Sequence, residues 1–436
     1  MSPRSAILKR VLRDRRVRSL ELAYTGFNMA EYGVWVAVLV YAYQRGGVDV
    51  TAMVAVAQLL PSAVMAPVLA RSVDRWGALA ALRAGYWTQS VALVAAGGLV
   101  LVDASSAAVY AAAIIAAIAV TMTRPAQAGL VPALASAPGE LTAINVLSSW
   151  AESLSILVGP ALTGVLIGVD GPGAAIAAFA ICSLTAALLV ADLGSSRRDG
   201  RLIGDRAIHP VTDPATGAAA GPERARFGGL LAVLGAQYLV VGMLDVLLVA
   251  FAISVLRLGA SGAGYLNAAL GAGGLGGSLA AVTLIGRREL VRPLLAAAVL
   301  WAALLAMLGA WPTVLNAFLL LAAAGMSRSL LDVSGRTILL HGAPPLMRAR
   351  LFGMLEGLAM LALALGALLV PVLVELGSVR AALMAAAALL AGITLAALAR
   401  PTGLIGLSAT PATHAPAPAV NAPAPVAGGG GGAPAL

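Results

Sequence analysis

Two acidic residues stand inside long apolar segments, where a charge is costly and usually serves a function. Glu31 and Asp245 are 214 residues apart, about half of the 436-residue chain. Tyr24 and Tyr238 have the same separation, and each precedes its acid by seven residues, or two helical turns. A carboxylate at mid-membrane depth rarely faces lipid and usually marks a pathway. Two acids at equivalent points of a duplicated chain therefore predict a two-fold symmetric transport machine with a central cavity.

The wall of this cavity is predicted from further polar residues at helical spacing. Asn28 falls between Tyr24 and Glu31 on one helix face, and Asn145 shares a stripe with Glu152 in another segment. The expected cavity residues are Glu31, Asp245, Glu152, Tyr24, Tyr238, Asn28 and Asn145. The alternative for any one acid is a structural hydrogen bond between helices.

We expect these acids to bind protons or cations. No Lys or Arg falls near the middle of any predicted span, so internal neutralisation by a basic partner is not expected. Removal from water then favours the protonated carboxyl group. An acid that loads and releases a proton as the cavity alternates between the two sides can couple transport to a proton gradient.

A second group of charges is predicted to form an ion-pair ladder. Arg328, Asp332 and Arg336 stand at i, i+4 and i+8, so they share one helix face. A structural or gating ladder is favoured over substrate binding. Glu356 is grouped with them, and its expected partner is a nearby arginine, Arg348 or Arg350.

The composition places these residues in a membrane. The chain is 60% hydrophobic and 11% charged, with mean hydropathy +0.94, whereas a soluble domain carries about a quarter charged residues. The basic residues that give the net charge of +9 cluster between apolar segments, which indicates membrane orientation rather than nucleic-acid binding. The single Cys182 and three dispersed His residues predict neither a metal site nor a cofactor. The sequence holds no nucleophile–base pair or phosphate loop that would predict an enzyme.

Twelve apolar stretches are long enough to cross a bilayer as helices, which takes roughly 20 residues. They are 20–43, 51–70, 79–102, 106–123, 140–168, 173–193, 229–256, 262–285, 291–310, 313–333, 350–376 and 379–399. The predicted organisation is a basic amphipathic segment (1–19), a six-helix half (20–193), an Arg-rich linker (194–228), a second six-helix half (229–400) and a disordered Pro/Ala/Gly-rich tail (401–436).

The orientation follows from the excess of Lys and Arg on the cytoplasmic side of membrane proteins. With the N-terminus inside, only Arg45, Arg257 and Arg380 of the 28 Lys and Arg residues fall outside. We therefore expect a multi-pass protein of the plasma (inner) membrane with both termini cytoplasmic. Its expected partners are the lipid bilayer, protons and a small-molecule substrate, and we expect a monomer.

The duplication extends beyond the first pair of acids. Arg124 and Arg328 are 204 residues apart, and so are Glu152 and Glu356. Both arginines stand at the inner end of a predicted span, and both glutamates fall in the next span. The order of elements is therefore the same in two parallel halves of six helices.

Several stretches resemble the major facilitator superfamily, and the likeness covers residues 15–400. The loop after the second span contains Asp74, Arg75 and Gly77 of that family's Gly-x-x-x-Asp-Arg/Lys-x-Gly motif, with Ala70 in place of the first Gly. The resemblance implies a cytoplasmic gate in which the Asp caps a helix of the opposite half. Arg124, before a Pro in the fourth span, is similar to an Arg of proton-coupled members and is grouped with the gate residues Asp74, Arg75 and Gly77; the alternative is a membrane anchor.

The fifth span carries a partial exporter signature. Gly159 and Pro160 match the family's Gly-Pro-x-x-Gly-Gly, and Gly164 matches its last residue, while Thr163 replaces the other glycine. Gly and Pro in a membrane helix permit close packing and a bend. The segment resembles the enterobactin-exporter and macrolide-efflux branch.

One glycine-rich match is interpreted as a packing surface. Residues 271–276 fit G-x-G-x-x-G, the dinucleotide fingerprint, but they lie in an apolar span with no preceding strand. Gly273 and Gly277 instead form a small-xxx-small face that favours close helix packing.

Three functions fit these residues. The first is proton-coupled export of small lipophilic or cationic compounds, of the drug or siderophore type, by alternating access. The second keeps the fold but makes the protein an importer or facilitator. The third is a membrane sensor or assembly partner that does not transport. Aromatic residues such as Tyr32, Trp35 and Trp150 could provide surface for a lipophilic cation.

Overall fold

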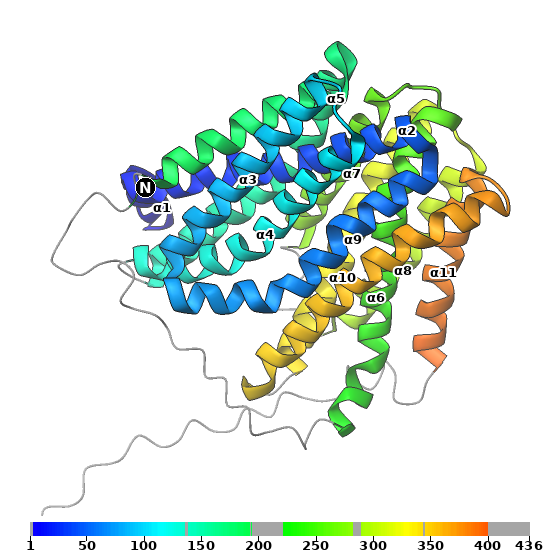
Figure 1. Ribbon diagram of the computed structural model, residues 1–436. Helices are drawn as coiled ribbons and strands as arrows, with labels where there is room; N and C mark the ends of the chain where they lie inside the picture. The colour runs from blue at the N-terminus through cyan, green and yellow to red at the C-terminus, as the bar shows by residue number, and fades with distance from the viewer. Residues whose placement is uncertain are drawn as a thin grey trace, which may run out of the picture.

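The computed structural model describes residues 3–135, 138–191, 193, 221–281, 289–342 and 345–399, and helices account for nearly all of these residues. The elements are α1 (Pro3–Arg13), α2 (Arg15–Trp76), α3 (Ala78–Leu101), α4 (Ser106–Leu134), α5 (Pro138–Ala191), α6 (Gly221–Ala250), the π-helix η2 (Phe251–Val255), α7 (Ser261–Ala280), α8 (Val291–Ala310), α9 (Val314–Gly342), α10 (Pro345–Glu375) and α11 (Val379–Ala399) (Figure 1). The predicted tail and residues 194–220 of the predicted linker lie outside the described residues.

Two of these helices are hairpins of two segments each. A continuous helix of 62 residues such as α2 would be about 90 Å long, roughly three times the thickness of a bilayer core. The helical backbone is interrupted at Gly46 and Gly47 in α2, and at Asp170 and Gly171 in α5. Gly47 and Gly171 have φ angles of 63° and 76°, which favour glycine. Figure 1 shows α2 reversing its direction between its two segments.

The structure confirms an all-helical polytopic membrane protein. Nine helices of the described chain are long and apolar enough to cross a membrane, and α2 and α5 are two of them. The 20-residue α7 is not among the nine but packs within the bundle. The number of twelve spans remains a prediction.

The helices form two halves, α1–α5 and α6–α11, which occupy different regions of Figure 1. Within the halves, α2 packs on α5, α3 on α4, α7 on α9 and α6 on α10. Between the halves, α5 packs on α7, and α2 packs on α10 and α6. One large hydrophobic core is shared by the two halves, and a second, smaller one lies within the first half.

The halves are in close contact at the end of the bundle that lies away from α1. A Cβ atom on Gly264 of α7 would lie 2.6 Å from the carbonyl oxygen of Pro160 in α5, so only glycine fits there. A Cβ atom on Gly271 would lie 2.7 Å from the carbonyl oxygen of Ile156. These contacts bring the backbones of the two halves together at the end away from α1, which we name the sealed end.

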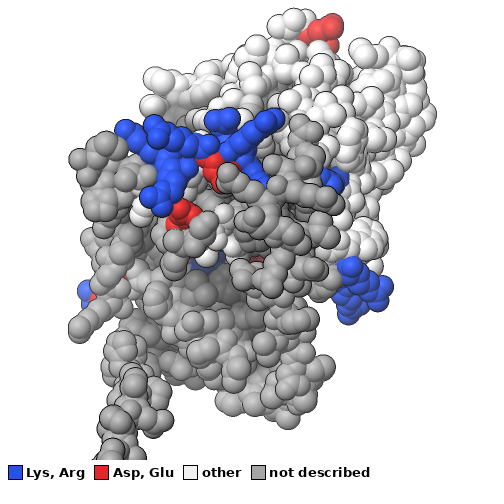
Figure 2. Space-filling model, turned by 90° about the vertical axis from the view of Figure 1, so that its left-hand side faces the viewer, with Lys and Arg blue, Asp and Glu red and all other residues white. Residues whose placement is uncertain are grey.

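The opposite end of the bundle carries α1 and basic side chains. Arg10 of α1 lies 3.7 Å from Glu140, at the start of α5. Figure 2 views the molecule from this end and shows Lys and Arg gathered there, with a hollow beneath them. The functional residues lie between this end and the sealed end.

Candidate functional site

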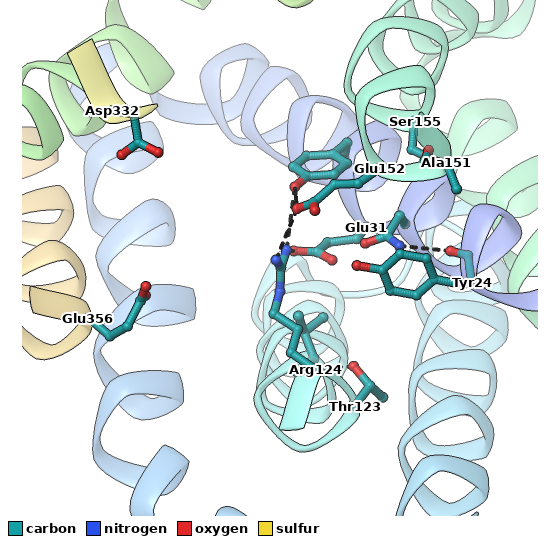
Figure 3. A network of polar contacts seen from close by, with 12 residues as sticks. Tyr24, Glu31, Thr123, Arg124, Ala151, Glu152, Ser155, Asp332 and Glu356 are labelled. Atoms are coloured by element: carbon teal, nitrogen blue, oxygen red, sulfur yellow. Dashed lines mark hydrogen bonds and ion pairs between the residues drawn. The ribbon is translucent and has the colours of Figure 1, made fainter. Parts of the chain in front are cut away.

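An arginine in the first half bridges two of the predicted cavity acids. Arg124 of α4 donates from Nη2 to Glu31 Oε1 at 3.0 Å and from Nη1 to Glu152 Oε1 at 3.2 Å (Figure 3). The hydroxyl of Tyr32 donates to Glu152 Oε1 at 3.3 Å and accepts from Arg124 Nη2 at 3.4 Å. These four residues, which we name the Arg124 cluster, join α2, α4 and α5.

The expectation that the acids lack a basic partner is therefore wrong for Glu31 and Glu152. Glu31 lies midway along its segment, 16 residues after the start of α2 and 15 before the interruption at Gly46. The predicted fourth span ends at residue 123, but α4 continues to Leu134, so Arg124 lies within the helix rather than at its end. The apolar stretch ends at the first charged residue, Arg124, whereas the helix continues past it because its side chain faces a polar cavity rather than lipid.

The second half contains a matching group, the Arg336 cluster. Arg336 of α9 donates from Nε to Asp332 Oδ2 and from Nη1 to Glu356 Oε1, both at 3.0 Å. Its Nη2 donates to the Tyr238 hydroxyl at 2.7 Å, and that hydroxyl donates to Asp332 Oδ1 at 2.9 Å. The cluster joins α6, α9 and α10.

Part of the predicted ion-pair ladder is present. The pair between Asp332 and Arg336 is confirmed, but Arg328 makes no ion pair with any described residue. Glu356 pairs with Arg336, and the side chains of its expected partners, Arg348 and Arg350, lie outside the described residues. The long Arg336 side chain reaches the neighbouring helix, which spacing along one helix cannot indicate.

The two clusters are related by the duplication, but not through the expected arginines. Glu152 and Glu356, which are 204 residues apart, both bind an arginine from the preceding segment of their half. The sequence equivalent of Arg124 at that separation is Arg328, yet Arg336 occupies the corresponding role two helical turns later. The second half therefore contains the same kind of cluster with its arginine at a different position, and Arg328 forms no ion pair within the described residues.

Asp245 does not share the surroundings of Glu31. It is half-buried, and its neighbours are the indole of Trp35, which hydrogen-bonds to it, and Arg328, an electrostatic neighbour beyond ion-pair distance. Trp35 belongs to α2 and Asp245 to α6, so this contact joins the two halves. The equivalent positions in the sequence thus have different chemistry in the fold.

The remaining predicted cavity residues differ in their placement. Tyr24 lies beside Glu31 in Figure 3. Asn28 is buried and donates to the Tyr24 carbonyl oxygen in its own helix at 2.8 Å, so its amide serves the backbone. Asn145 is exposed, and no described residue joins its side chain to the Arg124 cluster.

A cavity of about 260 Å³ lies between the halves, with walls from α5, α7 and α9. Glu152 lines it from the first half, and Arg328 and Asp332 line it from the second. Each cluster therefore contributes one carboxylate to the same cavity. Figure 3 shows Asp332 and Glu356 across from the Arg124 cluster.

The predicted gate loop is described only in part. Gly77 ends α2 with a φ of 82°, and its N–H donates to the Val73 carbonyl oxygen at 3.0 Å, so the turn requires glycine. Arg75 is exposed, and the Asp74 side chain lies outside the described residues. The gate at Asp74, Arg75 and Gly77 therefore remains a prediction. Arg124, which was grouped with it, instead contacts the cavity acids Glu31 and Glu152.

The Gly159, Pro160 and Gly164 motif provides close packing. A Cβ atom on Gly159 would lie 3.0 Å from the Met29 carbonyl oxygen in α2, and one on Gly164 would lie 2.8 Å from the Tyr265 ring in α7. The interruption of α5 falls later, at Asp170, so the expected bend does not appear as a break at Pro160. The motif brings α5 close to both halves.

One intramembrane acid was missed by the sequence reasoning. Glu21 accepts a hydrogen bond from Ser148 at 2.7 Å, and its other oxygen is buried without a partner. The predicted first span begins at residue 20, so Glu21 lies at its edge. Its position ten residues before Glu31 in the same apolar segment was the sequence feature that could have indicated it.

Within the described residues, no group of three or more His, Cys, Asp or Glu could hold a metal ion.

Known proteins resemble this chain in structure rather than in sequence. No family model matches it, and no curated protein matches it. A POT family transporter in complex with a thioalcohol-conjugated peptide has a TM-score of 0.71 at 12% identity, covering 88% of this chain and 95% of the other. The nucleoside transporter NupG has a TM-score of 0.68 at 15% identity, covering 88% of this chain and 98% of the other. A bacterial homologue of the iron transporter ferroportin, in its inward-facing state, has a TM-score of 0.67 at 15% identity, covering 94% of this chain and 100% of the other.

These likenesses establish the fold. The chain is a multi-pass membrane protein with the major facilitator fold, in agreement with the resemblance drawn from its loops. At these identities the neighbours do not place it in the enterobactin-exporter and macrolide-efflux branch, and that assignment remains a prediction.

Proposed function

We propose that this protein is a secondary active transporter that exports small lipophilic or cationic compounds in exchange for protons. The observation that carries the proposal is the pair of Arg124 and Arg336 clusters, one in each half, which place Glu152 and Asp332 on a shared cavity. Such a site at the interface of two repeats is where transporters of this architecture hold substrate and coupling ion. We place it in the plasma (inner) membrane as a monomer.

In the Arg124 cluster, a carboxylate can either pair with Arg124 or bind a proton. One guanidinium serves two carboxylates, so the cluster carries a net charge of −1 when both acids are ionised. That charge can be balanced by a proton or by a cationic substrate, and the two then compete. Protonation of Glu152 would weaken its pair with Arg124 and loosen α5 from α4.

Helix α5 connects the protonation of Glu152 to the sealed end of the bundle. Glu152 lies on α5, whose Pro160 and Gly164 pack against Gly264 of α7. A shift of α5 would therefore change the contact that closes one end of the cavity. Alternating access needs this contact to open while the α1 end closes, with Asp74, Arg75 and Gly77 as the proposed gate at that end.

Proton flux in proteoliposomes tests the proposal. Addition of a substrate, chosen from a panel tested in a transport-deficient strain with and without an uncoupler, should move protons across the membrane. The Glu31→Gln plus Asp245→Asn variant should lose this flux, whereas Glu375→Gln, at the exposed end of α10, should keep it. Normal flux with unchanged pH dependence in the double variant would exclude the acids as coupling sites. Flux in the import direction would favour an importer, and no flux with any substrate would favour a sensor.

A further inference from the structure

Arg328 is a charged side chain in the middle of a membrane-spanning helix, and it forms no ion pair with any described residue. It lies 14 residues from either end of α9 and lines the cavity between the halves. Its Nε is buried without a hydrogen-bond partner, and no described acid lies within 4 Å of its guanidinium. The acid one turn away, Asp332, is already engaged by Arg336 and Tyr238.

An unpaired guanidinium at this depth is expensive, because neither water nor a counter-charge fully compensates it. Asp245 is its electrostatic neighbour, but beyond the distance of an ion pair. The planar fork of an arginine binds a carboxylate through two parallel hydrogen bonds. The group that Arg328 lacks is therefore an anion, and the cavity beside it can admit one.

The facing wall offers the opposite charge. Glu152 Oε1 accepts from Arg124 and Tyr32, whereas its Oε2 accepts from no described residue. About a third of the Glu152 side chain is exposed, at 34%. Serine hydroxyls complete the lining between the two charges: Ser149, Ser153, Ser278 and Ser329. A lipophilic cation alone would leave Arg328 without an anionic partner among the described residues.

We propose that the cavity binds an amphoteric molecule, with its carboxylate at Arg328 and its cationic group at Glu152. This inference rests on the proposed function and names the substrate class of the same site. A cavity of about 260 Å³ is small for a ligand site, which favours a molecule the size of an aromatic amino acid. A purely cationic substrate would need only the acids, whereas an amphoteric substrate would also need Arg328. The dependence of binding on Arg328 therefore distinguishes these two substrate classes.

Three probes that share one aromatic group test the inference: phenylalanine (zwitterion), phenylalanine methyl ester (cation) and N-acetylphenylalanine (anion). Their affinities are measured by calorimetry on the purified full chain in lipid nanodiscs. The zwitterion should bind the unchanged protein about tenfold or more tightly than either single-charge probe, since each charged hydrogen bond contributes that much. Arg328→Gln should weaken the zwitterion and the anion about tenfold and leave the cation nearly unchanged.

The controls separate binding from folding. Arg292→Gln removes an exposed arginine of α8 and should change none of the affinities. Arg328→Lys keeps the charge but loses the fork, so it should bind the zwitterion with intermediate affinity, and it serves as the test if Arg328→Gln does not fold. Glu152→Gln should weaken the cation and the zwitterion and spare the anion.

Three results would overturn the inference: equal binding of cation and zwitterion, unchanged zwitterion affinity in Arg328→Gln, or no binding of any probe. The proposed function fails differently, because it fails when no substrate of any charge drives proton flux in the unchanged protein.

Discussion

Replacing Gly264 with alanine tests how the sealed end of the bundle controls the cavity. The new Cβ atom would lie 2.6 Å from the Pro160 carbonyl oxygen and 2.6 Å from the Gly164 Cα atom. Real Cβ atoms essentially never approach other atoms closer than 3.0 Å, and both partners here are backbone. The alanine can therefore be accommodated only if α5 and α7 separate.

The cost applies only to the conformation in which this end is closed. Overpacking by one methyl group typically costs about 1–3 kcal/mol. Taking about 2 kcal/mol, and about 1.4 kcal/mol for each factor of ten, the equilibrium moves roughly 30-fold towards conformations with this end open. We expect slower transport and a population that is biased away from the structure described.

Disulfide formation across the contact measures the shift. A Cβ atom on Gly168 would lie 3.7 Å from the Ser261 Cβ atom, which suits a disulfide. In a Cys182→Ser background, the pair Gly168→Cys and Ser261→Cys should cross-link readily. Adding Gly264→Ala should slow cross-linking by about an order of magnitude or more, in line with the population shift.

Gly276 provides the matched control on the same helix. A Cβ atom there would meet only the flexible end of Met326 at 3.4 Å, so Gly276→Ala should leave cross-linking and transport unchanged. If Gly264→Ala cross-links as fast as its parent and transports normally, the α5–α7 contact does not control access to the cavity.

Three further predictions concern coupling, orientation and stability. Arg124→Gln leaves both acids of its cluster without a cation, so we expect loss of substrate-driven proton flux in proteoliposomes, and normal flux would refute the coupling role. Asp103→Cys in a Cys182→Ser background should react with an impermeant maleimide added outside intact cells, and labelling only from the cytoplasm would reverse the orientation. Ser183→Ala removes a 2.7 Å hydrogen bond to the side-chain amide oxygen (Oε1) of the buried Gln89 and should cost about 1–3 kcal/mol in thermal unfolding while changing substrate affinity little; an unchanged melting temperature would refute it.

The mechanism developed above gives the arginines a role beside the acids. In the proposed mechanism Arg124 binds the carboxylates of Glu31 and Glu152, whereas Arg328 binds the substrate. This division separates coupling from recognition within one cavity.

The sequence alone predicted the membrane class, the helical fold and the duplication, because each depends on properties averaged over many residues. Twenty apolar residues in succession have few alternatives to a spanning helix. The repeated positions of Glu152 and Glu356 carried over into repeated ion pairs. The glycines at 273 and 277 were predicted to permit close packing, and a Cβ atom on Gly277 would indeed lie 2.5 Å from the Met326 carbonyl oxygen of α9.

Only the tertiary structure decided which charges meet. Arg124 contacts an acid 93 residues earlier in the chain, and Arg336 contacts one 20 residues later. Such pairs depend on the rotation and register of whole helices against one another, and a few ångströms separate an ion pair from a free charge. For that reason the acid at Glu31 could be predicted as functional from its surroundings in the sequence. The partner it binds, and the free guanidinium of Arg328, followed only from how the helices pack.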